Sequence, residues 1–439
     1  MVSEDTIYID KFIEHEKQGT YFTLPFHVDP DAESIEIKYQ YARFDLDEIQ
    51  TDIYIAQNKP EINIIDFGLI GPDGEQVGMS GSDKTTFFVS ESKTTPGYLP
   101  CPILPGEWNI LVGAYKVEAE GIKVFYEVTI KYKHRRLLKG DLHTHTFASD
   151  GVHSMEELAW KAKRNGLDFV AITDHNQLVS RAALPQVEGV TLIPGVEWTH
   201  YQGHANFLGV DKPFDGCFAT NTLEETQKIF KTAHDRSALI TVNHPYEDGC
   251  EFKYDLQSLP FDCLEIWNGP MRESNLRAVG LWQQMLVSGR RIPICGGSDY
   301  HRDTPFIFLG GPTMCLYSLS NGKTDLLDAL RGGHGFITFA PNGPCVEMTA
   351  GARIMGDQIS LSDTNVVKVA ANGLLEADVV RVVTQSSSDV LHTAAVDGQL
   401  EYEFVVINAG FVRIEVLRAF LPGLPMLPAL ITNPIYFTD

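Results

Sequence analysis

The 439-residue sequence predicts a multidomain fold of the α/β plus β class, with a central β/α module between two β modules. Residues 1–136 and 346–439 contain short β-branched and aromatic runs separated by turn signals, which is typical of antiparallel sheets. Residues 137–345 alternate strand-like and helix-like segments, which favours a mainly parallel sheet or barrel. The length agrees with several domains, because one domain usually holds roughly 100–200 residues.

The N-terminal module is expected to be a β-sandwich. Its segments "YFTLPFHV" and "IKVFYEVTIKY" are typical of strands, and turn signals stand at 71–74 and 104–108. The one helix expected in this module is a short segment near Ile49. A second β-sandwich is expected in the C-terminal module, where strands are predicted in "VVKVAAN", "DVVRVVTQ", "YEFVVI" and "FVRIEVLRAF".

In the central module the segment "SMEELAWKAKRNG" carries the start and stop signals of a helix. Ser154 can cap its N-terminus, Glu157 completes a capping box, and Gly166 ends it. Further helices are expected in "TLEETQKIFKTAH", "ESNLRAVGLWQQMLVSG" and "TDLLDALRGG". Strands are expected in "LDFVAITDHN", "LITVNHP", "CLEIWNG", "RIPICGGSDYH" and "GFITF".

Composition and charge argue against several classes of function. The chain has 35 Lys+Arg and 58 Asp+Glu, a net charge of −23, which argues against binding to a nucleic-acid backbone. No apolar run is long enough for a bilayer and the acidic start "MVSEDTIYID" is unlike a secretory signal, so we expect a cytoplasmic protein without membrane partners. The seven scattered cysteines form no C-x-x-C pair and are expected to be reduced thiols.

Histidines and carboxylates gather where the predicted strands of the central module end. Eleven of the fourteen histidines lie between His134 and His334. In "KGDLHTHTFASDG", His143 and His145 stand two apart, so on an extended strand both point to one face. Each such residue alone can be a helix cap or a turn residue, but five strand ends together indicate a site on the face where β/α barrels build active sites. The histidines expected not to be ligands are His153, His200 and His234.

The side chains at these strand ends match a multinuclear metal site. Neutral imidazoles suit Zn²⁺, Fe²⁺ and Mn²⁺, and a carboxylate can bridge two ions. Two ions roughly 3.5–4 Å apart can generate a hydroxide near neutral pH and stabilise both oxygens of an in-line displacement. A metal-dependent hydrolase is therefore the expected class.

In order along the chain, "DLHTHTFASDG", "AITDHN", "GVEW", "HANFLG", "NHP" and "GGSDYH" resemble the motifs of the PHP (polymerase and histidinol phosphatase) superfamily. The segments "GGPTMCLY", "LLDALRGGHGFITFAPNGP" and "ALITNPIYF" are similar to its CehA/McbA-type metallohydrolases, which tend to carry flanking β domains. The resemblance covers residues 137–345 and implies a distorted TIM-like β/α barrel of seven strands. It also implies two or three divalent ions, Zn, Fe or Mn.

The resemblance further implies which residues hold the ions. The first ion would be held by His143, His145, Glu197 and Asp299. Glu197 would bridge to a second ion held by His244 and His204, with His200 as a nearby alternative to His204. A third ion would be held by Asp150, His175 and His301, although some relatives carry His in place of Asp150.

Two further carboxylates complete the expected centre. By the same resemblance, Asp141 and Asp174 would orient the ligating imidazoles from behind.

The leading hypothesis is hydrolysis of a small phosphate ester by a hydroxide that bridges the metal ions. Arg302 is a candidate phosphate clamp, because a guanidinium binds oxyanions bidentately; the alternative is a surface salt bridge. The residues expected to carry catalysis are Glu197, Asp299, His301 and Arg302. The residues expected to line the pocket are Asn176, Asn206, Asn243, Tyr246, Trp267, Asn268, Arg272 and Arg302, with a core position as the alternative for Trp267.

Two other functions stay open. The same centre could cleave a carbamate or a carboxylic ester, for which apolar pocket walls are expected in place of cations. The third hypothesis is a non-catalytic role in which the β modules bind carbohydrate, and these modules could also mediate homo-oligomer contacts. In the leading case the partner is a small-molecule phosphate ester.

Overall fold

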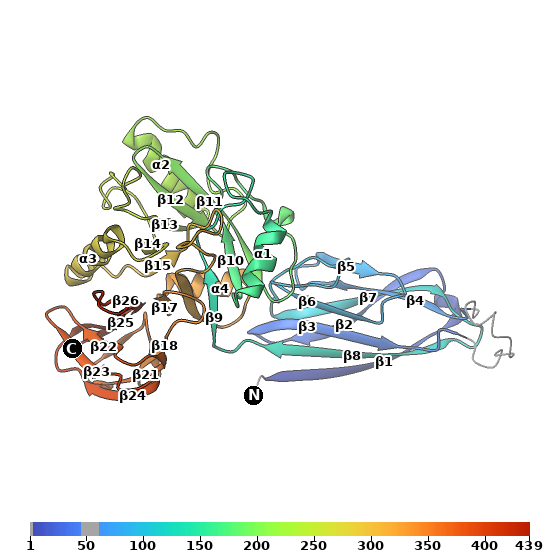
Figure 1. Cartoon of the computed structure of the whole chain (residues 1–439). Coiled ribbons are helices and arrows are strands. Elements are labelled where there is room, and N and C mark those ends of the chain that lie inside the picture. The colour runs from blue at the N-terminus through green and yellow to red at the C-terminus, as the bar shows by residue number, and fades with distance from the viewer. Residues whose placement is uncertain (1–2, 45–60) are drawn as a thin grey trace. The chain divides into compact units, whose positions relative to one another are not determined.

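The computed structural model describes residues 3–44 and 61–439 (Figure 1). The chain divides into two compact units, Met1–His134 and Arg135–Asp439, called the first and the second unit below. The helix expected near Ile49 lies outside the described residues. None of the helices in the described part of the chain combines the length and the apolar character that a bilayer crossing requires.

The first unit is built of antiparallel strands. They are β1 (Glu4–Ile13), β2 (Thr20–Val28), β3 (Ala32–Gln40), β4 (Ile64–Ile70), β5 (Gln76–Ser80), β6 (Thr86–Ser90), β7 (Gly106–Lys116) and β8 (Ile122–Tyr132), with a 3-10 turn η1 (His15–Lys17). In its described residues one sheet has the order β1-β8-β3-β6 and the other β2-β7-β4-β5. Alternate residues of both sheets, among them Ile35, Phe67 and Ile110, are fully buried in one shared core.

The second unit begins with the β/α segments. They are β9 (Arg136–Asp141), α1 (Met155–Arg164), β10 (Phe169–Ile172), η2 (Arg181–Ala183), β11 (Thr191–His200), β12 (Gly203–Leu208), α2 (Leu223–Asp235), β13 (Leu239–Val242), β14 (Cys263–Asn268), α3 (Glu273–Val287), β15 (Ile294–Gly297), β16 (Thr313–Ser318), α4 (Lys323–Arg331) and β17 (Gly335–Thr338). The capping box predicted for α1 is confirmed, because Ser154 Oγ accepts from Glu157 N at 3.1 Å and Glu157 Oε2 accepts from Ser154 N at 2.8 Å.

The rest of the second unit is all strand. The elements are β18 (Cys345–Ala350), β19 (Arg353–Ile354), β20 (Gln358–Ser360), β21 (Val366–Leu374), β22 (Val379–Val383), β23 (Ser388–Thr393), β24 (Gly398–Val405), β25 (Gly410–Arg418), β26 (Leu427–Thr432) and β27 (Ile435–Thr438).

The central sheet is mixed, in contrast to the mainly parallel sheet that the sequence predicts. Its strand order begins β15-β14-β13-β12-β11-β10-β9-β16-β17. The pairs β9/β10, β10/β11, β13/β14 and β14/β15 are parallel. Strand β12 is antiparallel to both of its neighbours, since the two residues between β11 and β12 can only form a hairpin. Strand β16 likewise returns antiparallel to β9.

The central sheet is curled, so that β15, the strand at one end of this order, lies close to β9 and β17. A Cβ on Gly297 would lie 2.4 Å from His143 Cβ, and a Cβ on Gly296 would lie 3.0 Å from Ile337 Cγ2. Only glycine permits this approach, which explains the glycine pair in "CGGSD". The curl brings the C-terminal ends of β9 and β15 side by side, although they are far apart in the sequence.

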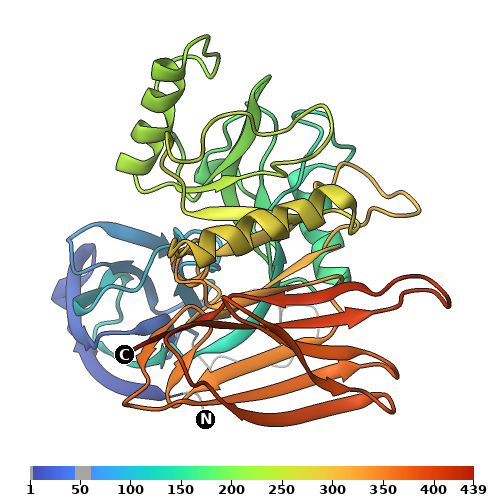
Figure 2. The ribbon, with the colours of Figure 1, turned by 90° about the vertical axis from the view of Figure 1, so that its left-hand side faces the viewer.

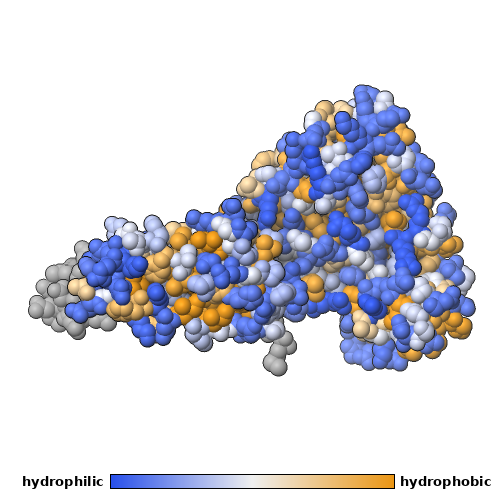
Figure 3. Space-filling model, turned by 180° about the vertical axis from the view of Figure 1, so that it is seen from behind, coloured by the Kyte–Doolittle hydropathy of each residue, from blue (hydrophilic) through white to orange (hydrophobic). Residues whose placement is uncertain are grey.

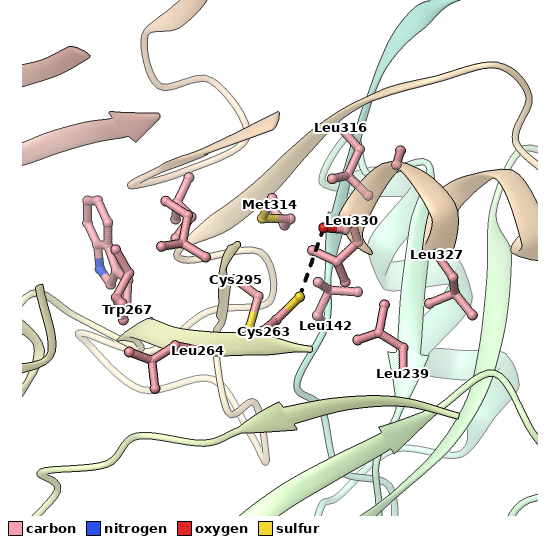
Figure 4. Packing of buried hydrophobic residues seen from close by; sticks show 14 of the residues in the cluster. Leu142, Leu239, Cys263, Leu264, Trp267, Cys295, Met314, Leu316, Leu327 and Leu330 are labelled. Atoms are coloured by element: carbon pink, nitrogen blue, oxygen red, sulfur yellow. Dashed lines mark hydrogen bonds between the residues drawn. The ribbon is translucent and has the colours of Figure 1, made fainter. Parts of the chain in front are cut away.

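A hydrophobic core lies between this sheet and the helices α3 and α4 (Figure 4). Leu142, Leu264 and Leu330 contribute to it, and the thiol of Cys263 donates to the carbonyl oxygen of Leu330 at 3.9 Å. Trp267, which we expected in the pocket, packs in this core with 2 % exposure, and its Nε1 donates to the Gly269 carbonyl. The core position, which the sequence left open as the alternative for Trp267, is therefore the one observed.

The C-terminal strands continue the central sheet. β17 pairs with β26, and the order runs on through β25, β22 and β23. Arg413 donates through Nε to Gln283 Oε1 of α3 at 3.1 Å, and its guanidinium lies 4.9 Å from the Trp282 ring. Figure 2 shows α3, in yellow, beside these red strands. The boundary expected between residues 345 and 346 therefore crosses a shared sheet and shared side-chain contacts.

Glu415 on β25 forms the buried ion cluster that holds this region. It accepts from Arg381 Nε at 2.7 Å and pairs with Arg413, and both Glu415 and Arg413 are at most 3 % exposed. Burial raises the pKa of the Glu415 carboxyl, but Arg413 and Arg381 lower it more, so the net pKa is below the ordinary value. The cluster therefore stabilises the fold while Glu415 is ionised.

Replacing Glu415 by Gln should lower the free energy of unfolding by about 3–5 kcal/mol at neutral pH, because Arg413 is left buried without its counter-charge. A lowered folded-state pKa contributes stability above the ordinary Glu value of roughly 4.3 and loses it at lower pH. The gap between wild type and variant should therefore narrow in acid. Urea unfolding at several pH values measures both effects. Glu403→Gln, which removes an exposed partner of Lys368, should change stability by less than about 0.5 kcal/mol.

Candidate metal centre

The two histidines of "DLHTH" follow directly on β9 and point to one side. His143 and His145 are both fully buried, with ring centroids 5.3 Å apart. Leu142 points into the hydrophobic core, and Thr144 Oγ1 donates to the Ala171 carbonyl of β10. The alternation expected for extended backbone therefore holds, and both imidazoles face the interior of the curled sheet.

Two carboxylates from other strands complete the first group. Glu197 lies in β11 and Asp299 follows β15. His143 Nε2 lies 3.2 Å from Glu197 Oε1, and His145 Nε2 lies 3.0 Å from Asp299 Oδ1. Four side chains that the motifs assign to the first ion are therefore in contact.

The second group forms on the other side of Glu197. Its Oε1 lies 3.2 Å from His204 Nδ1 and 3.4 Å from His244 Nε2, so this carboxylate faces both groups. Glu197 and His204 are not at strand ends but within the β11/β12 hairpin, where Thr199 pairs with His204 and places both on one face. His200, the alternative to His204, points away, with Nε2 2.9 Å from the Thr220 carbonyl.

A third group lies at the more open side. His301 Nε2 is 3.1 Å from Asp150 Oδ1, and His175 Nε2 is 3.6 Å from Asp150 Oδ2. With His145 these residues place one ligand atom each within 4.8 Å of one another. The Asp150 side chain is 54 % exposed, so this group is the most accessible to solvent. Of the histidines expected not to be ligands, His153 instead lies 3.0 Å from the Tyr300 hydroxyl and His234 is exposed on α2.

The clearest sign of a ligand is the set of buried polar atoms without a hydrogen bond. Among the described residues, six buried side-chain N or O atoms have no partner, and five of them belong to this cluster. They are His143 Nε2, both ring nitrogens of His145, His204 Nδ1 and Asp299 Oδ1. Buried polar atoms are almost always paired, since leaving them unpaired is costly. A set of imidazole nitrogens and carboxylate oxygens fits divalent ions such as Zn²⁺, Mn²⁺ or Fe²⁺.

The carboxylates and imidazoles of the cluster shift one another's pKa values. Burial lowers the pKa of His143, but the carboxylates of Asp299, Glu197 and Glu265 raise it more, so the net pKa lies well above the ordinary value. The pKa of His244 is likewise raised well above the ordinary value, against the effect of burial, by Cys250 and Glu197. Burial raises the pKa of Glu197, but His143 and other imidazoles hold it well below its usual range.

Asp141 and Asp174 hold the loops rather than the imidazoles, contrary to the prediction. Asp141 accepts from the backbone N of His143, Ser298 and Gly310 at 2.8–3.2 Å. Asp174 accepts from Thr146 N at 2.7 Å and from the hydroxyls of Thr146 and Ser149. Both carboxylates lie behind the ligand loops, where unpaired backbone N–H groups need acceptors.

A carboxylate outside the expected ligand set that does contact one of its imidazoles is Glu265 of β14. Its Oε1 lies 3.0 Å from His143 Nδ1, and the residue is 2 % exposed. Glu265 is not among the site residues expected from the sequence. The available signal was a glutamate inside the apolar strand "CLEIW", since a carboxylate in a buried strand needs a specific partner.

Several residues expected to bind substrate have other partners. Asn243 Nδ2 donates to Glu197 Oε1 at 2.9 Å and to Asn206 Oδ1, and Asn206 donates to the Leu142 carbonyl. Both asparagines are buried at or below 2 % exposure, so they position Glu197 from beneath. Asn176 exchanges two hydrogen bonds with the Thr199 backbone.

The remaining predicted pocket residues lie nearer the solvent. Asn268 Nδ2 is 3.4 Å from Asp299 Oδ2, and Arg272 Nη1 donates to Glu247 Oε1 at 2.6 Å. Arg277 lies 4.4 Å from the Tyr246 ring. Arg302 is exposed and has no ion-pair partner in the described part of the chain, so the alternative of a surface salt bridge is not seen.

Backbone strain gathers at the same place. Asn176, His244 and Asp299 have positive φ angles of 52°, 24° and 52° without being glycine. Such conformations cost about 1–3 kcal/mol each and persist where surrounding contacts enforce them, typically at functional sites. In this chain they set the direction in which two of the expected ligands leave their strands.

Comparison with known families gives one match within this region. Residues 141–259 match the family described as PHP domain.

Three curated relatives are similar to the same part of the chain. An uncharacterized protein of Methanocaldococcus jannaschii (MJ1587) is 28 % identical over 161 residues, 33 % of this chain and 90 % of the relative. A probable phosphatase of Acetivibrio thermocellus is 30 % identical, over 25 % of this chain and 51 % of the relative. The 5'-3' exoribonuclease Rnm of Salmonella typhimurium is 36 % identical, over 16 % of this chain and 27 % of the relative. The chain thus spans about half or less of the two relatives with a named activity.

Two solved structures are similar to parts of this chain. A two-domain protein of Bacteroides vulgatus, whose name describes a PHP-like metal-dependent phosphoesterase, aligns with a TM-score of 0.40 at 16 % identity, over 64 % of this chain and 90 % of that chain. A protein of Bifidobacterium adolescentis named as a metal-dependent phosphoesterase aligns with a TM-score of 0.27 at 14 % identity, over 39 % of this chain and 90 % of that chain.

Metal binding should release protons and strengthen as the pH rises beyond about 6.5, because the raised pKa values of His143 and His244 keep these imidazoles protonated to a higher pH than usual. A proton on either ring competes with the ion for the same nitrogen. Calorimetric titration of the metal-free protein with Zn²⁺, in two buffers of different ionisation enthalpy, measures the protons released. An affinity that is constant between pH 6 and pH 8.5 would contradict this expectation.

Substitutions of Glu197 and of Asp150 should have different effects on the number of bound metal ions. Glu197→Gln changes a carboxylate that faces two ligand groups and should abolish at least two bound ions. Asp150→Ala changes only the open third group and should leave the other ions bound. Metal content after dialysis, measured by plasma mass spectrometry, distinguishes these cases. Equal losses in both variants would show that the groups do not bind separately.

Proposed function

Residues 141–259 match the PHP domain family, and from that premise we propose that the chain is a metal-dependent phosphoesterase that hydrolyses a small phosphate ester. The observation that carries the proposal is the set of five buried, unpaired ligand atoms that converge from three segments: the loop after β9, strand β12 and the loop after β15. The names of two relatives, a phosphatase and an exoribonuclease, support the same bond type.

The nine expected ligands have the chemistry that such a reaction needs. When bound, two or three divalent ions would supply Lewis acidity toward the phosphoryl oxygens and a nucleophile from water near neutral pH. We propose that they are held by His143, His145, Asp150, His175, Glu197, His204, His244, Asp299 and His301.

The side chains have separate tasks in this proposal. Glu197 holds two ligand groups at a fixed separation, and Asn243 fixes one of its oxygens. Asp299 and His301 close the centre from the β15 side, and Arg302 is free to pair with a phosphate oxygen beside them. Arg272 is the next cation, although Glu247 now neutralises it.

A second candidate is hydrolysis of a carbamate or carboxylic ester with an aromatic leaving group. The observation in its favour is a pair of exposed aromatic side chains on the ligand loops. Phe147, two residues after His145, is 67 % exposed, and Phe306, five residues after His301, is 75 % exposed. The phosphate ester is preferred because Arg302 offers an unpaired cation on the same loop as Phe306.

The proposal also includes the predicted domains, the family branch, the cellular location and the partners. We propose that residues 137–345 correspond to the distorted seven-stranded barrel of the family, that residues 1–136 and 346–439 are its flanking sandwiches, and that the chain belongs to the CehA/McbA-type branch. A cytoplasmic location and the absence of a nucleic-acid partner also remain proposals. The net charge of −23 supports the second of these, whereas relatives named for exonuclease activity weigh against it.

The β modules are proposed as sites of self-association. Hydrophobic patches stand among hydrophilic ones on the face seen in Figure 3. On the first unit Tyr8, Phe12 and Phe125 are 47–73 % exposed and share one outer sheet face. Exposed aromatic groups of this kind suit protein or glycan partners. Analytical ultracentrifugation with and without an oligosaccharide distinguishes the two.

The function is tested by metal content together with hydrolysis of p-nitrophenyl phosphate and p-nitrophenyl acetate. Wild type should hold at least two ions and cleave the phosphate, and His143→Ala should lose at least about 100-fold of that activity. His234→Ala is the control, because this exposed histidine lies on α2 outside the cluster. Cleavage of the acetate alone would favour the second candidate. A protein that takes up no Zn²⁺, Mn²⁺ or Fe²⁺ would rule out both.

A further inference from the structure

Glu265 is a buried carboxylate without a lysine or arginine partner among the described residues. It lies in β14 between the core residues Leu264 and Ile266 and is 2 % exposed. Its hydrogen-bond partners are the His143 ring, the backbone N–H of His244 and the side-chain amide of Asn268. An ionised carboxylate in such a place is costly unless a nearby cation balances it. Among the described residues, the cluster of expected metal ligands is the one source of positive charge that it touches.

The first contact, with His143, determines which nitrogen of the His143 ring carries the proton. Glu265 Oε1 lies 3.0 Å from His143 Nδ1, and a carboxylate can only accept a hydrogen bond. The proton of the neutral ring therefore sits on Nδ1. The lone pair is left on Nε2, the buried and unpaired nitrogen that faces Glu197 and Asp299.

The second contact holds the other ligand group. Glu265 Oε2 accepts from the backbone N–H of His244 at 2.8 Å. His244 has a φ of 24°, so its backbone needs outside support to stay in this conformation. The ring itself has only a weak partner at Nδ1, the Cys250 thiol at 3.8 Å. The backbone bond to Glu265 is thus the stronger restraint on where His244 Nε2 points.

A third contact extends the restraint to Asp299. Asn268 Nδ2 lies 3.3 Å from Glu265 Oε2 and 3.4 Å from Asp299 Oδ2. One carboxylate therefore reaches His143, His244 and, through one amide, Asp299.

We propose that Glu265 is a positioning residue that couples the two ligand groups on either side of Glu197, so that both ions bind tightly only while it is a carboxylate. The inference rests on the metal centre of the proposed function. Glu265 acts through the ligands and touches neither ion nor substrate. Carboxylates that accept from a ligating imidazole raise its basicity and fix its orientation, and their loss typically weakens metal binding about 10–100-fold.

Glu265→Gln is the discriminating change, because it keeps the shape and removes one acceptor. Three donors converge on the carboxylate, whereas an amide offers one acceptor oxygen and one NH₂ group. If the NH₂ group faces His143, the ring must move its proton to Nε2 and loses the lone pair for the ion. If it faces His244, the backbone N–H loses its acceptor. Either orientation weakens a ligand.

The matched control is Asp357→Asn. Asp357 Oδ1 lies 3.2 Å from His334 Nε2, and its Oδ2 accepts from Ile354 N at 2.9 Å. This carboxylate therefore also joins an imidazole to a backbone N–H, but it touches none of the nine expected ligands. It reports what the same chemical change does to the fold alone.

The experiment measures three quantities on the full chain: Zn²⁺ affinity by competition with a chromophoric chelator, the visible absorption of the Co²⁺-loaded protein, and the melting temperature of the metal-free protein. We expect Glu265→Gln to bind both Zn²⁺ ions about 10–100-fold more weakly and to shift the Co²⁺ bands. Asp357→Asn should keep the wild-type affinity within twofold and an unchanged spectrum.

Other results would overturn the inference. Wild-type Zn²⁺ affinity and Co²⁺ spectrum in Glu265→Gln would remove the positioning role. A lower metal-free melting temperature with an unchanged Co²⁺ spectrum would assign Glu265 to the fold alone. Failure of the wild type itself to bind Zn²⁺ or Co²⁺ would refute the metal centre, and this outcome is distinct because it does not depend on the variant.

Discussion

The contact on which the rest of the site depends is that of Glu197 with the imidazoles around it. The carboxylate is fully buried and lies 2.7–3.7 Å from nitrogens of His143, His145, His175, His204 and His244. A buried negative charge of this kind needs positive charge close by. Protons on the histidines provide it in the metal-free chain, which is why the pKa of His143 is raised and that of Glu197 lowered. Divalent ions can take the place of those protons.

Carboxylates behind the loops that carry the expected ligands accept hydrogen bonds from the backbone N–H groups of these loops. Asp141 joins the loop after β9 to the loop after β15 through His143 N, Ser298 N and Gly310 N. Asp174 does the same for the segment that leads to Asp150. These bonds hold positions on segments far apart in sequence, so a multinuclear centre can be assembled without a regular barrel wall. The glycine pair at 296–297 is the steric condition for this assembly.

The C-terminal strands continue the central sheet and contact α3, the helix that follows the segment beside Asp299. Gln283 and Trp282 of α3 contact Arg413, and α3 follows directly on the Asn268–Arg272 segment beside Asp299. A change in the Glu415 cluster can therefore reach the site through one helix. This arrangement gives the outer β region a structural task that does not require it to bind anything.

The sequence by itself determined the ligand types and their places along the chain. Strand periodicity put His143 and His145 on one face, the capping box of α1 was readable from Ser154 and Glu157, and the order of motifs indicated the family. These features are local, since they depend on residues within a few positions of one another. What only the tertiary structure decided is non-local. The antiparallel placement of β12 brings His204 to Glu197, Trp267 packs in the hydrophobic core, and Glu265 meets His143 across 122 residues. The physical reason is that burial and hydrogen-bond geometry arise only in the folded chain. The sequence around a glutamate or an asparagine therefore does not distinguish a residue that faces a substrate from one that faces a ligand or the core.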